Sequence, residues 1–200
     1  MNLEELHARK GFICDMDGVI YLGNQLLPGV AEFVTWLNEN DKRFLFLTNS
    51  SERSPKELRQ KLQRMGLDIG EEHFYTSALA TAAFLKKQAP GCTAFVIGAP
   101  GLLNALYDVG VTMNDVDPDY VLVFMGKPNP LMMRTGLQLL GVHSEEAAMV
   151  GDRMDTDVIA GMESGLATVL VLSGCTSRTD VNDYPYRPTY ILNGVGDIPG

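Results

Sequence analysis

Two aspartates separated by one residue, Asp15 and Asp17, directly follow an apolar run in the segment GFICDMDG. One charge is enough to end a strand, so the second carboxylate indicates a catalytic role. Two acids at one strand end can divide the work of phosphoryl transfer, because one attacks phosphorus while the other moves protons. The spacing therefore predicts Asp15 as a nucleophile and Asp17 as a general acid and base.

Polar side chains of matching chemistry follow later apolar runs of the chain. They are a hydroxyl, an amide, an amine and a carboxylate: Thr48, Asn49, Lys127 and Asp152. A carboxylate that attacks a phosphate dianion meets strong repulsion, so a divalent cation and a fixed ammonium group are needed to neutralise charge. Carboxylate oxygens are the ligands that Mg²⁺ prefers. The pattern predicts a magnesium-dependent phosphoryl-transfer site.

These residues must be positioned by the elements that precede them. Short, continuously apolar runs recur at 12–14, 44–47, 94–97, 121–124, 147–150, 169–172 and 190–192. Runs without polar alternation are typical of strands buried on both faces, as in a parallel sheet covered by helices. Helical signals lie between them; Ser54, Pro55 and Glu57, for example, form a helix start, and Gly66 stands at its expected end.

The alternation of strands and helices predicts an α/β fold with a doubly wound, mostly parallel sheet and helices on both faces. The carboxyl ends of parallel strands share one edge, which is where such folds bind ligands. We therefore expect the polar residues named above to converge there. No segment divides the chain, so we predict one domain over residues 1–200.

Composition excludes several classes of function. The 200 residues carry a formal net charge of -9, which argues against binding to nucleic acid or to an anionic membrane. The 3 cysteines form no CxxC pair, so neither a disulfide framework nor a zinc site is indicated. The start of the chain shows no signal peptide, and no apolar run is long enough to cross a bilayer. We expect a soluble, cytoplasmic protein.

Four segments in order, DMDGV, LTNS, GKP and GDRMDTD, resemble the four motifs of the haloacid dehalogenase (HAD) superfamily. The flanking segments YTSALATAAFL, VLVLSGCTS and YRPTYIL resemble the NagD-type branch, the nucleotide and p-nitrophenyl phosphatases. The likeness extends from about Gly11 to the end. It implies a HAD-like Rossmannoid core and hydrolysis of phosphomonoesters through an aspartyl-phosphate. An aspartate at position 17 separates the phosphatases of that superfamily from its dehalogenases.

The resemblance also implies roles for the acids. Asp15 would be the nucleophile and a Mg²⁺ ligand, and Asp17 would be the acid and base that binds the metal through its backbone carbonyl. Asp152 would complete the metal site. Asp157 would orient its neighbours rather than bind the metal directly.

The remaining motif residues are expected to handle the phosphoryl group. By the same resemblance, Thr48 and Asn49 would hold the phosphoryl oxygens. Lys127 would neutralise charge between nucleophile and phosphate.

The sequence departs from the NagD-type pattern at one place. Relatives carry a substrate-covering cap domain before GKP, but only Met125 and Gly126 intervene here. We therefore expect no cap domain near 124–127, an open site and weak discrimination among small phosphorylated metabolites such as nucleotides or sugar phosphates. Phe124 and Met125 at the join would favour a homo-oligomer.

Two other functions fit part of the pattern. A signalling receiver domain also places acids, Thr and Lys at strand ends, but its first acids are adjacent rather than spaced by one residue. A catalytically weak or silent capless core could serve as a scaffold or phosphate-binding module. Hydrolysis of p-nitrophenyl phosphate with and without Mg²⁺ would distinguish the silent core from the enzyme.

Overall fold

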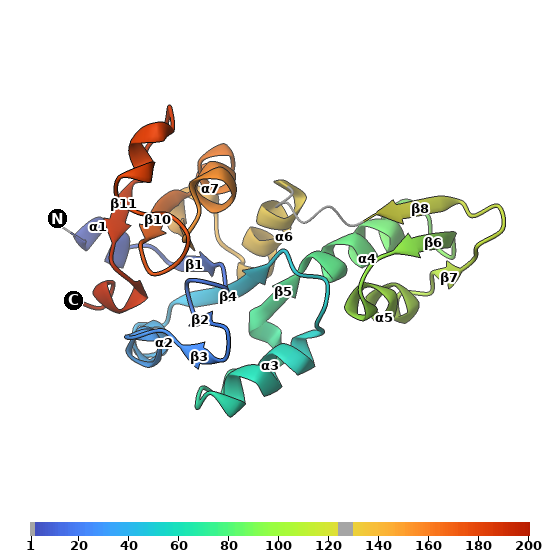
Figure 1. The fold of residues 1–200 in the computed structure, drawn as a ribbon, viewed down its shortest axis with the longest axis horizontal. Helices are drawn as coiled ribbons and strands as arrows, with labels where there is room; N and C mark the ends of the chain where they lie inside the picture. Colours follow the sequence, from blue (N-terminus) through green and yellow to red (C-terminus); the bar gives the residue numbers. More distant parts are fainter. Residues whose placement is uncertain (1–2, 124–129) are drawn as a thin grey trace.

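The computed structural model describes residues 3–123 and 130–200. Its larger sheet has six strands in the order β11-β10-β9-β1-β4-β5, and all neighbouring strands are parallel (Figure 1). These strands are β1 (Gly11–Cys14), β4 (Arg43–Thr48), β5 (Phe74–Thr76), β9 (Ala147–Gly151), β10 (Ala167–Val171) and β11 (Tyr190–Leu192). The predicted fold class, an α/β fold with a mostly parallel sheet, is confirmed.

Helices cover both faces of this sheet. They are α1 (Glu4–His7), α2 (Val30–Glu39), α3 (Pro55–Arg64), α4 (Ser77–Gln88), α6 (Pro130–Leu140) and α7 (Ile159–Glu163). Alternate residues of β1 point to opposite faces, as a strand requires. Phe12 packs in one buried cluster with α2 and α3, and Ile13 packs in another with α6 and part of α4.

Helix α3 shows how local sequence sets an element's bounds. The hydroxyl of Ser54 accepts a hydrogen bond from the backbone N–H of Glu57, and the Glu57 carboxylate accepts one from the backbone N–H of Ser54. This reciprocal cap and Pro55 start the helix. Gly66, with a φ of 92°, follows its end. The predicted helix is confirmed.

Smaller elements complete this part of the chain. Strands β2 (Tyr21–Leu22) and β3 (Gln25–Leu26) form a hairpin after β1. Short 3₁₀ turns lie at Glu71–His73, Ser144–Glu146, Asp180–Asp183 and Val195–Asp197, and a π turn lies at Met154–Val158.

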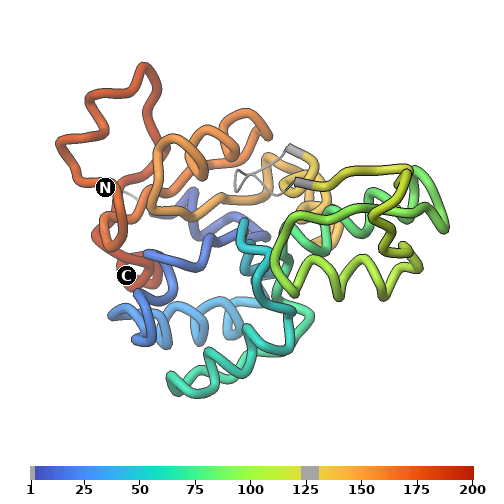
Figure 2. Tube along the Cα trace, turned by 45° about the vertical axis from the view of Figure 1, so that its right-hand side comes forward, coloured from blue at the N-terminus to red at the C-terminus, as the bar shows by residue number. Residues whose placement is uncertain are grey.

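The two ends of the chain lie near each other in both views (Figure 1 and Figure 2). The His7 ring contacts the carbonyl of Ile198 there.

A second sheet departs from the predicted arrangement. Strands β6 (Thr93–Ile97), β7 (Thr112–Met113) and β8 (Tyr120–Val123) form a separate three-stranded sheet in the order β7-β6-β8 (Figure 1). The runs 94–97 and 121–124 were expected in the main sheet, so that expectation is wrong. β5, which the apolar runs did not predict, takes the edge position beside β4 instead.

The burial of the second sheet explains the error. One face packs on α4 and on α5 (Pro100–Asp108), with Ala94 and Leu122 among the contacts. On the other face, Phe95, Ile97 and Val121 are 41%, 56% and 61% exposed. A short apolar run looks the same whether one or both faces of its strand are covered, so the sequence pattern could not separate the two cases.

Candidate active site

The carboxyl ends of β1 and β9 bring the first acids together. The strands pair with Cys14 opposite Val150, and the backbone N–H of Asp15 continues the ladder by donating to the Val150 carbonyl at 2.9 Å. Asp15 and Asp152 therefore leave neighbouring strands at the same edge. Carboxylate oxygens of Asp15, Asp152 and Asp157 all lie within 4.8 Å of one another. Asp15 and Asp152 thus lie together at this edge, as expected, and Asp157 joins them.

The loop after β10 fixes the position of Asp152. This side chain is buried, and its Oδ2 accepts a hydrogen bond of 2.6 Å from the backbone N–H of Cys175. Two glycines stand close to the same carboxylate. A Cβ at Gly18 or Gly174 would lie 2.5 or 2.0 Å from Asp152 Oδ2. Gly18 also has a φ of +79°, a conformation that other residues rarely adopt. The close backbone approach therefore requires both glycines.

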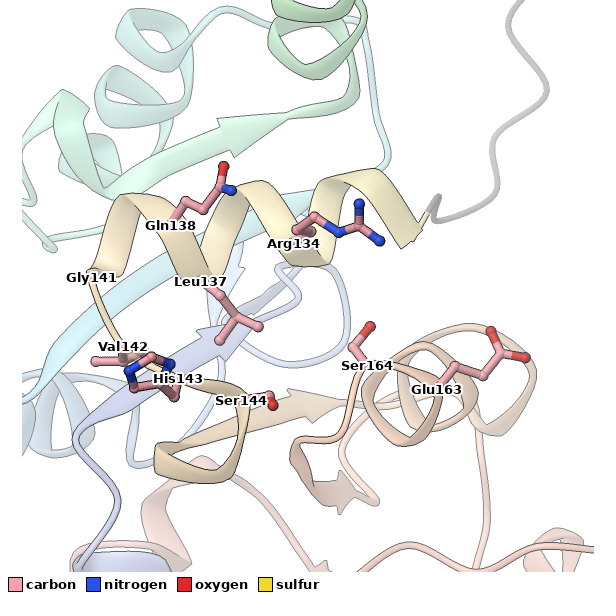
Figure 3. Close-up of a pocket in the computed structure, with 9 residues that line it drawn as sticks. All are labelled: Arg134, Leu137, Gln138, Gly141, Val142, His143, Ser144, Glu163 and Ser164. Carbon is pink, nitrogen blue, oxygen red and sulfur yellow. The ribbon is translucent and has the colours of Figure 1, made fainter.

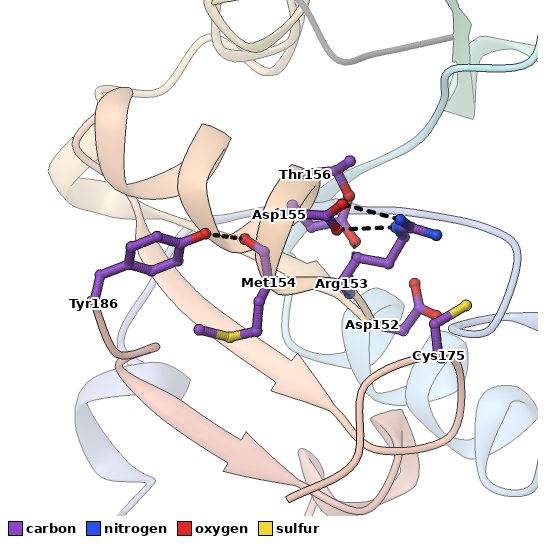
Figure 4. A network of polar contacts seen from close by, with 8 residues as sticks. Asp152, Arg153, Met154, Asp155, Thr156, Cys175 and Tyr186 are labelled. Atoms are coloured by element: carbon purple, nitrogen blue, oxygen red, sulfur yellow. Dashed lines mark hydrogen bonds and ion pairs between the residues drawn. The ribbon is translucent and has the colours of Figure 1, made fainter. Parts of the chain in front are cut away.

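Asp157 is held by the π turn Met154–Val158. Its Oδ2 accepts from the backbone N–H of Arg153 at 3.1 Å, and its Oδ1 accepts from the Thr156 hydroxyl at 3.2 Å. Two further contacts involve the same turn (Figure 4). The Tyr186 hydroxyl donates a hydrogen bond to the carbonyl of Met154, and the Arg153 guanidinium pairs with the Asp155 carboxylate. π turns often occur at functional sites.

The three clustered carboxylates disfavour one another's charge. Burial raises the pKa of Asp15 well above its usual range, and the negative charge of Asp157 raises it further. Burial likewise raises the pKa of Asp157 to about 7, with Asp152 adding to the effect. A divalent cation among these oxygens would relieve the repulsion, and hard oxygen donors of this type suit Mg²⁺. The residues present therefore fit the predicted metal.

Asp17 is not one of the three clustered acids. It is exposed, and its Oδ2 accepts a hydrogen bond of 3.2 Å from the hydroxyl of Tyr21. Its other oxygen, Oδ1, accepts no hydrogen bond from the described residues. The predicted contact between its backbone carbonyl and the metal stays a prediction.

Thr48 and Asn49 end the strand on the other side of β1. Thr48 is buried, and its Oγ1 accepts from the backbone N–H of Ser50 at 3.1 Å. The Oδ1 atom of Asn49 is buried and has no hydrogen-bond partner among the described residues. Buried polar atoms are rarely left unpaired, and functional sites account for many exceptions. Both residues stand at the same sheet edge as Asp15, as predicted, whereas Lys127 lies outside the described residues.

Sequence reasoning did not identify Tyr21 as part of this site. It follows Asp17 by four residues, and the turn between them brings its hydroxyl to the carboxylate. A tyrosine that follows Val19 and Ile20 is expected in the hydrophobic core, and the ring of Tyr21 is indeed buried. Only the turn geometry reveals the contact.

A pocket lies elsewhere on the molecule. A pocket of about 570 Å³ opens between α6, α7 and the loop before β9 (Figure 3). Arg134, His143 and Glu163 are among its lining residues. The segments that line it precede β9 and β10, so it lies toward the amino ends of those strands, away from the clustered acids. None of the predicted site residues lines it.

Comparison with known proteins decides the family. The sequence profile of the haloacid dehalogenase-like hydrolases matches residues 12–112, and a profile described as HAD-hydrolase-like matches residues 124–198. The chain belongs to the haloacid dehalogenase-like hydrolases.

Its relatives are phosphatases. Dihydroxyacetone phosphatase of Corynebacterium glutamicum is 34% identical over an alignment of 246 positions, which covers 94% of this chain and 90% of the relative. Ribonucleotide monophosphatase NagD of Escherichia coli is 32% identical, with 94% and 98% covered. The predicted superfamily, the NagD-type branch and the assignment as a HAD-type phosphatase are confirmed.

Solved structures of this HAD branch agree with the fold. NagD from the K-12 strain of Escherichia coli superposes with a TM-score of 0.90 at 31% identity, covering 96% of this chain and 98% of that one. 4-Nitrophenylphosphatase from Thermotoga maritima superposes with a TM-score of 0.92 at 28% identity, covering 98% of each chain. The second sheet is thus part of an arrangement that superposes on known structures over nearly the whole chain.

Proposed function

We propose that this HAD phosphatase hydrolyses phosphomonoesters of small metabolites in a Mg²⁺-dependent reaction, with Asp15 as the nucleophile. The observation that carries the proposal is the gathering of Asp15, Asp152 and Asp157 within 4.8 Å at the carboxyl edge of the sheet. Asp15, Asp152 and the backbone carbonyl of Asp17 would hold Mg²⁺, and Asp157 would orient these ligands from the π turn. When bound, the metal supplies positive charge against the phosphoryl group.

The reaction divides into two steps. In the first, an oxygen of Asp15 forms a bond to phosphorus as the bond to the leaving oxygen breaks, and Asp17 gives that oxygen a proton. In the second, Asp17 takes a proton from water as the water oxygen attacks phosphorus, which releases inorganic phosphate and restores Asp15. The exposed position of Asp17 suits both proton transfers, because the leaving group and water arrive from outside.

The phosphoryl oxygens would be held by Thr48 and Asn49. Their position at the end of β4, beside β1, places them at the edge that Asp15 occupies. In this role Asn49 would donate from its side-chain amide N–H groups, because phosphoryl oxygens accept hydrogen bonds. Lys127 would supply the ammonium group that neutralises charge in the transition state.

We also propose that the chain lacks the cap domain, as expected from its sequence. The alignment with dihydroxyacetone phosphatase spans 246 positions but uses 94% of 200 residues, about 188, so about 58 positions have no counterpart here. A single core domain with the cap insertion missing near 124–127 accounts for this difference. An open site would bind nucleotides, sugar phosphates and simpler esters with little discrimination. The same loss favours the alternative function, a catalytically weak core that binds phosphate.

We also propose that the protein forms a homo-oligomer. Phe124 and Met125 lie outside the described residues, but Phe95, Ile97 and Val121 expose an apolar face on the second sheet. β8 is an edge strand of that sheet, and edge strands without charges tend to pair with another strand. We expect a homo-oligomer in sedimentation analysis, and a monomer at all concentrations would contradict it.

Cellular location stays a prediction. In residues 3–123 and 130–200, no helix combines the length and apolar character needed to span a membrane. A cytoplasmic location and the absence of nucleic-acid and membrane partners rest on composition alone.

Hydrolysis of p-nitrophenyl phosphate tests the proposed function. We expect turnover that requires Mg²⁺, disappears with a chelator and is lost in Asp15→Asn. Asp155→Asn is the matched control, because Asp155 is an exposed carboxylate paired with Arg153 at 3.1 Å. Mass spectrometry of the acid-quenched enzyme should find phosphate on Asp15. Absence of turnover at every Mg²⁺ concentration would instead support the phosphate-binding module.

A further inference from the structure

Three side chains form a row beside the clustered acids: Lys61, Tyr21 and Asp17. The Tyr21 hydroxyl donates to Asp17 Oδ2 at 3.2 Å. The Lys61 ammonium nitrogen lies over the ring of Tyr21, 3.5 Å from its centroid. Lys61 comes from α3 and Tyr21 from the hairpin after β1, so the fold assembles this row from separate elements.

Backbone hydrogen bonds and core packing hold Tyr21 in place. The Tyr21 carbonyl accepts from the N–H of Gly18 at 2.8 Å, and the Tyr21 N–H donates to the carbonyl of Met16 at 3.2 Å. The ring is 2% exposed and belongs to the main core cluster. Its hydroxyl therefore has a fixed position, set by a tight turn and by packing.

Asp17 depends on that hydroxyl for its orientation. The carboxylate is exposed, and within the described part of the chain the only side-chain hydrogen bond that it accepts comes from Tyr21. An exposed carboxyl samples several rotamers unless a partner fixes it. With Oδ2 occupied by Tyr21, Oδ1 is left to carry the proton that moves. Burial and the charge of Asp17 both raise the pKa of Tyr21, so its hydroxyl stays protonated and remains a donor.

Lys61 acts on the ring of Tyr21. A cation over the face of a tyrosine is attracted by the electrons of the ring, more strongly where water is partly excluded. Partial burial lowers the pKa of Lys61, and the negative charge of Asp17 opposes that change. The ammonium group of Lys61 therefore has two effects. It attracts the ring of Tyr21, and its positive charge partly neutralises the negative charge of Asp17.

We propose that Tyr21 is a positioning residue that directs Asp17 toward the leaving oxygen of the substrate, and that Lys61 holds Tyr21 for this purpose. The proposal rests on the proposed function, in which Asp17 donates that proton. Positioned proton transfer contributes roughly 100- to 10,000-fold to a rate, and part of this is lost when the donor is free to turn away.

The test compares two esters that differ in their need for a proton. p-Nitrophenolate leaves without one, whereas the alkoxide of glycerol 3-phosphate needs one as its bond to phosphorus breaks. In Tyr21→Phe, kcat/KM for glycerol 3-phosphate should fall about tenfold, and kcat/KM for p-nitrophenyl phosphate by less than about twofold. kcat/KM is the informative quantity, because it reports the step in which the leaving group departs.

Variants of Lys61 should follow the same pattern. Lys61→Met removes the charge and keeps most of the stem, so it should lower the alkyl ester's kcat/KM about threefold. Lys61→Arg keeps a cation over the ring and should restore it. Lys56→Met, an exposed lysine of the same helix, is the matched control. Tyr190→Phe, in the edge strand β11, controls for loss of a tyrosine hydroxyl.

The outcomes separate a positioning role from a structural one. An equal fall for both esters in Tyr21→Phe, or no change for either, would overturn the proposal. The Mg²⁺ dissociation constant of Tyr21→Phe should match that of the parent protein, and a tenfold weaker value would also overturn it. If the phenylalanine variant does not fold, Lys61→Met decides by the same comparison. A parent protein that hydrolyses neither ester would refute the proposed function instead.

Discussion

Replacing Asp157 with asparagine should stabilise the metal-free protein. Asp157 is buried beside Asp15 and Asp152, and its pKa rises from 3.8 to about 7. At ~1.4 kcal/mol per pH unit, this difference corresponds to ~4 kcal/mol of lost stability once the pH is above about 7. Asparagine keeps the shape and can still accept from the N–H of Arg153. We expect a net gain of about 2 to 4 kcal/mol.

The sign of the pH dependence follows from the direction of the pKa change. A carboxyl whose folded pKa is raised binds a proton on folding, so its unfavourable effect is absent near pH 4 and grows as the pH rises toward about 7. Asp157→Asn should therefore match the parent protein near pH 4 and exceed it near pH 8. For a chain of this size, the gain corresponds to a rise in Tm of roughly 5 to 15 °C.

Thermal and urea unfolding with a chelator, at both pH values, provide the assay. Saturating Mg²⁺ should then stabilise the parent protein much more than the variant, because bound metal removes the repulsion that asparagine has already removed. Asp155→Asn is the control, since this exposed carboxylate should change stability by less than ~1 kcal/mol. A variant no more stable than the parent near pH 8 without metal, or equally stabilised at both pH values, would refute the reasoning.

Three further substitutions test single features of the fold and site. Gly174→Ala places a Cβ 2.0 Å from Asp152 Oδ2 and should weaken Mg²⁺ binding roughly tenfold to 100-fold in a calorimetric titration. Ser54→Ala removes the cap that accepts from Glu57 and should lower the free energy of unfolding by ~1 kcal/mol in urea. Phe12→Ala empties a fully buried position and should lower it by ~3 to 5 kcal/mol.

Each of these substitutions has a control on the same chain. Gly194→Ala adds a Cβ with no atom within 4 Å, so it should leave Mg²⁺ affinity unchanged. Gln60→Ala alters an exposed position of α3, and Phe84→Ala removes a ring that is 48% exposed. Losses of equal size in the control and the test variant would show that the assigned contact is not the cause.

Local sequence signals predicted much of the main sheet. The runs 12–14, 44–47 and 147–150 became β1, β4 and β9, because strands covered on both faces exclude polar residues. The start of α3 was equally predictable, since Ser54 and Glu57 cap it through contacts only three residues apart. The gathering of Asp15 with Asp152 followed from a general rule, that the carboxyl ends of parallel strands share one edge.

What could not be predicted depends on contacts between distant elements. β6 and β8 have apolar runs like those of the main sheet, and only their pairing shows that they form a second one. The contact of Lys61 with Tyr21 joins α3 to the hairpin after β1, and no spacing in the chain encodes it. Asp157 reaches the other acids through a π turn, an irregular element that the pattern of residues did not indicate.

The pairing of β1 with β9 aligns two acids that are far apart along the chain. A displacement of either strand by a single residue would exchange the two buried faces of β1, placing Phe12 where Ile13 packs and turning Asp15 away from its partners. Hydrophobic packing and catalysis therefore depend on one and the same alignment. Substitutions that loosen the interior of β1 should impair magnesium affinity before they unfold the protein.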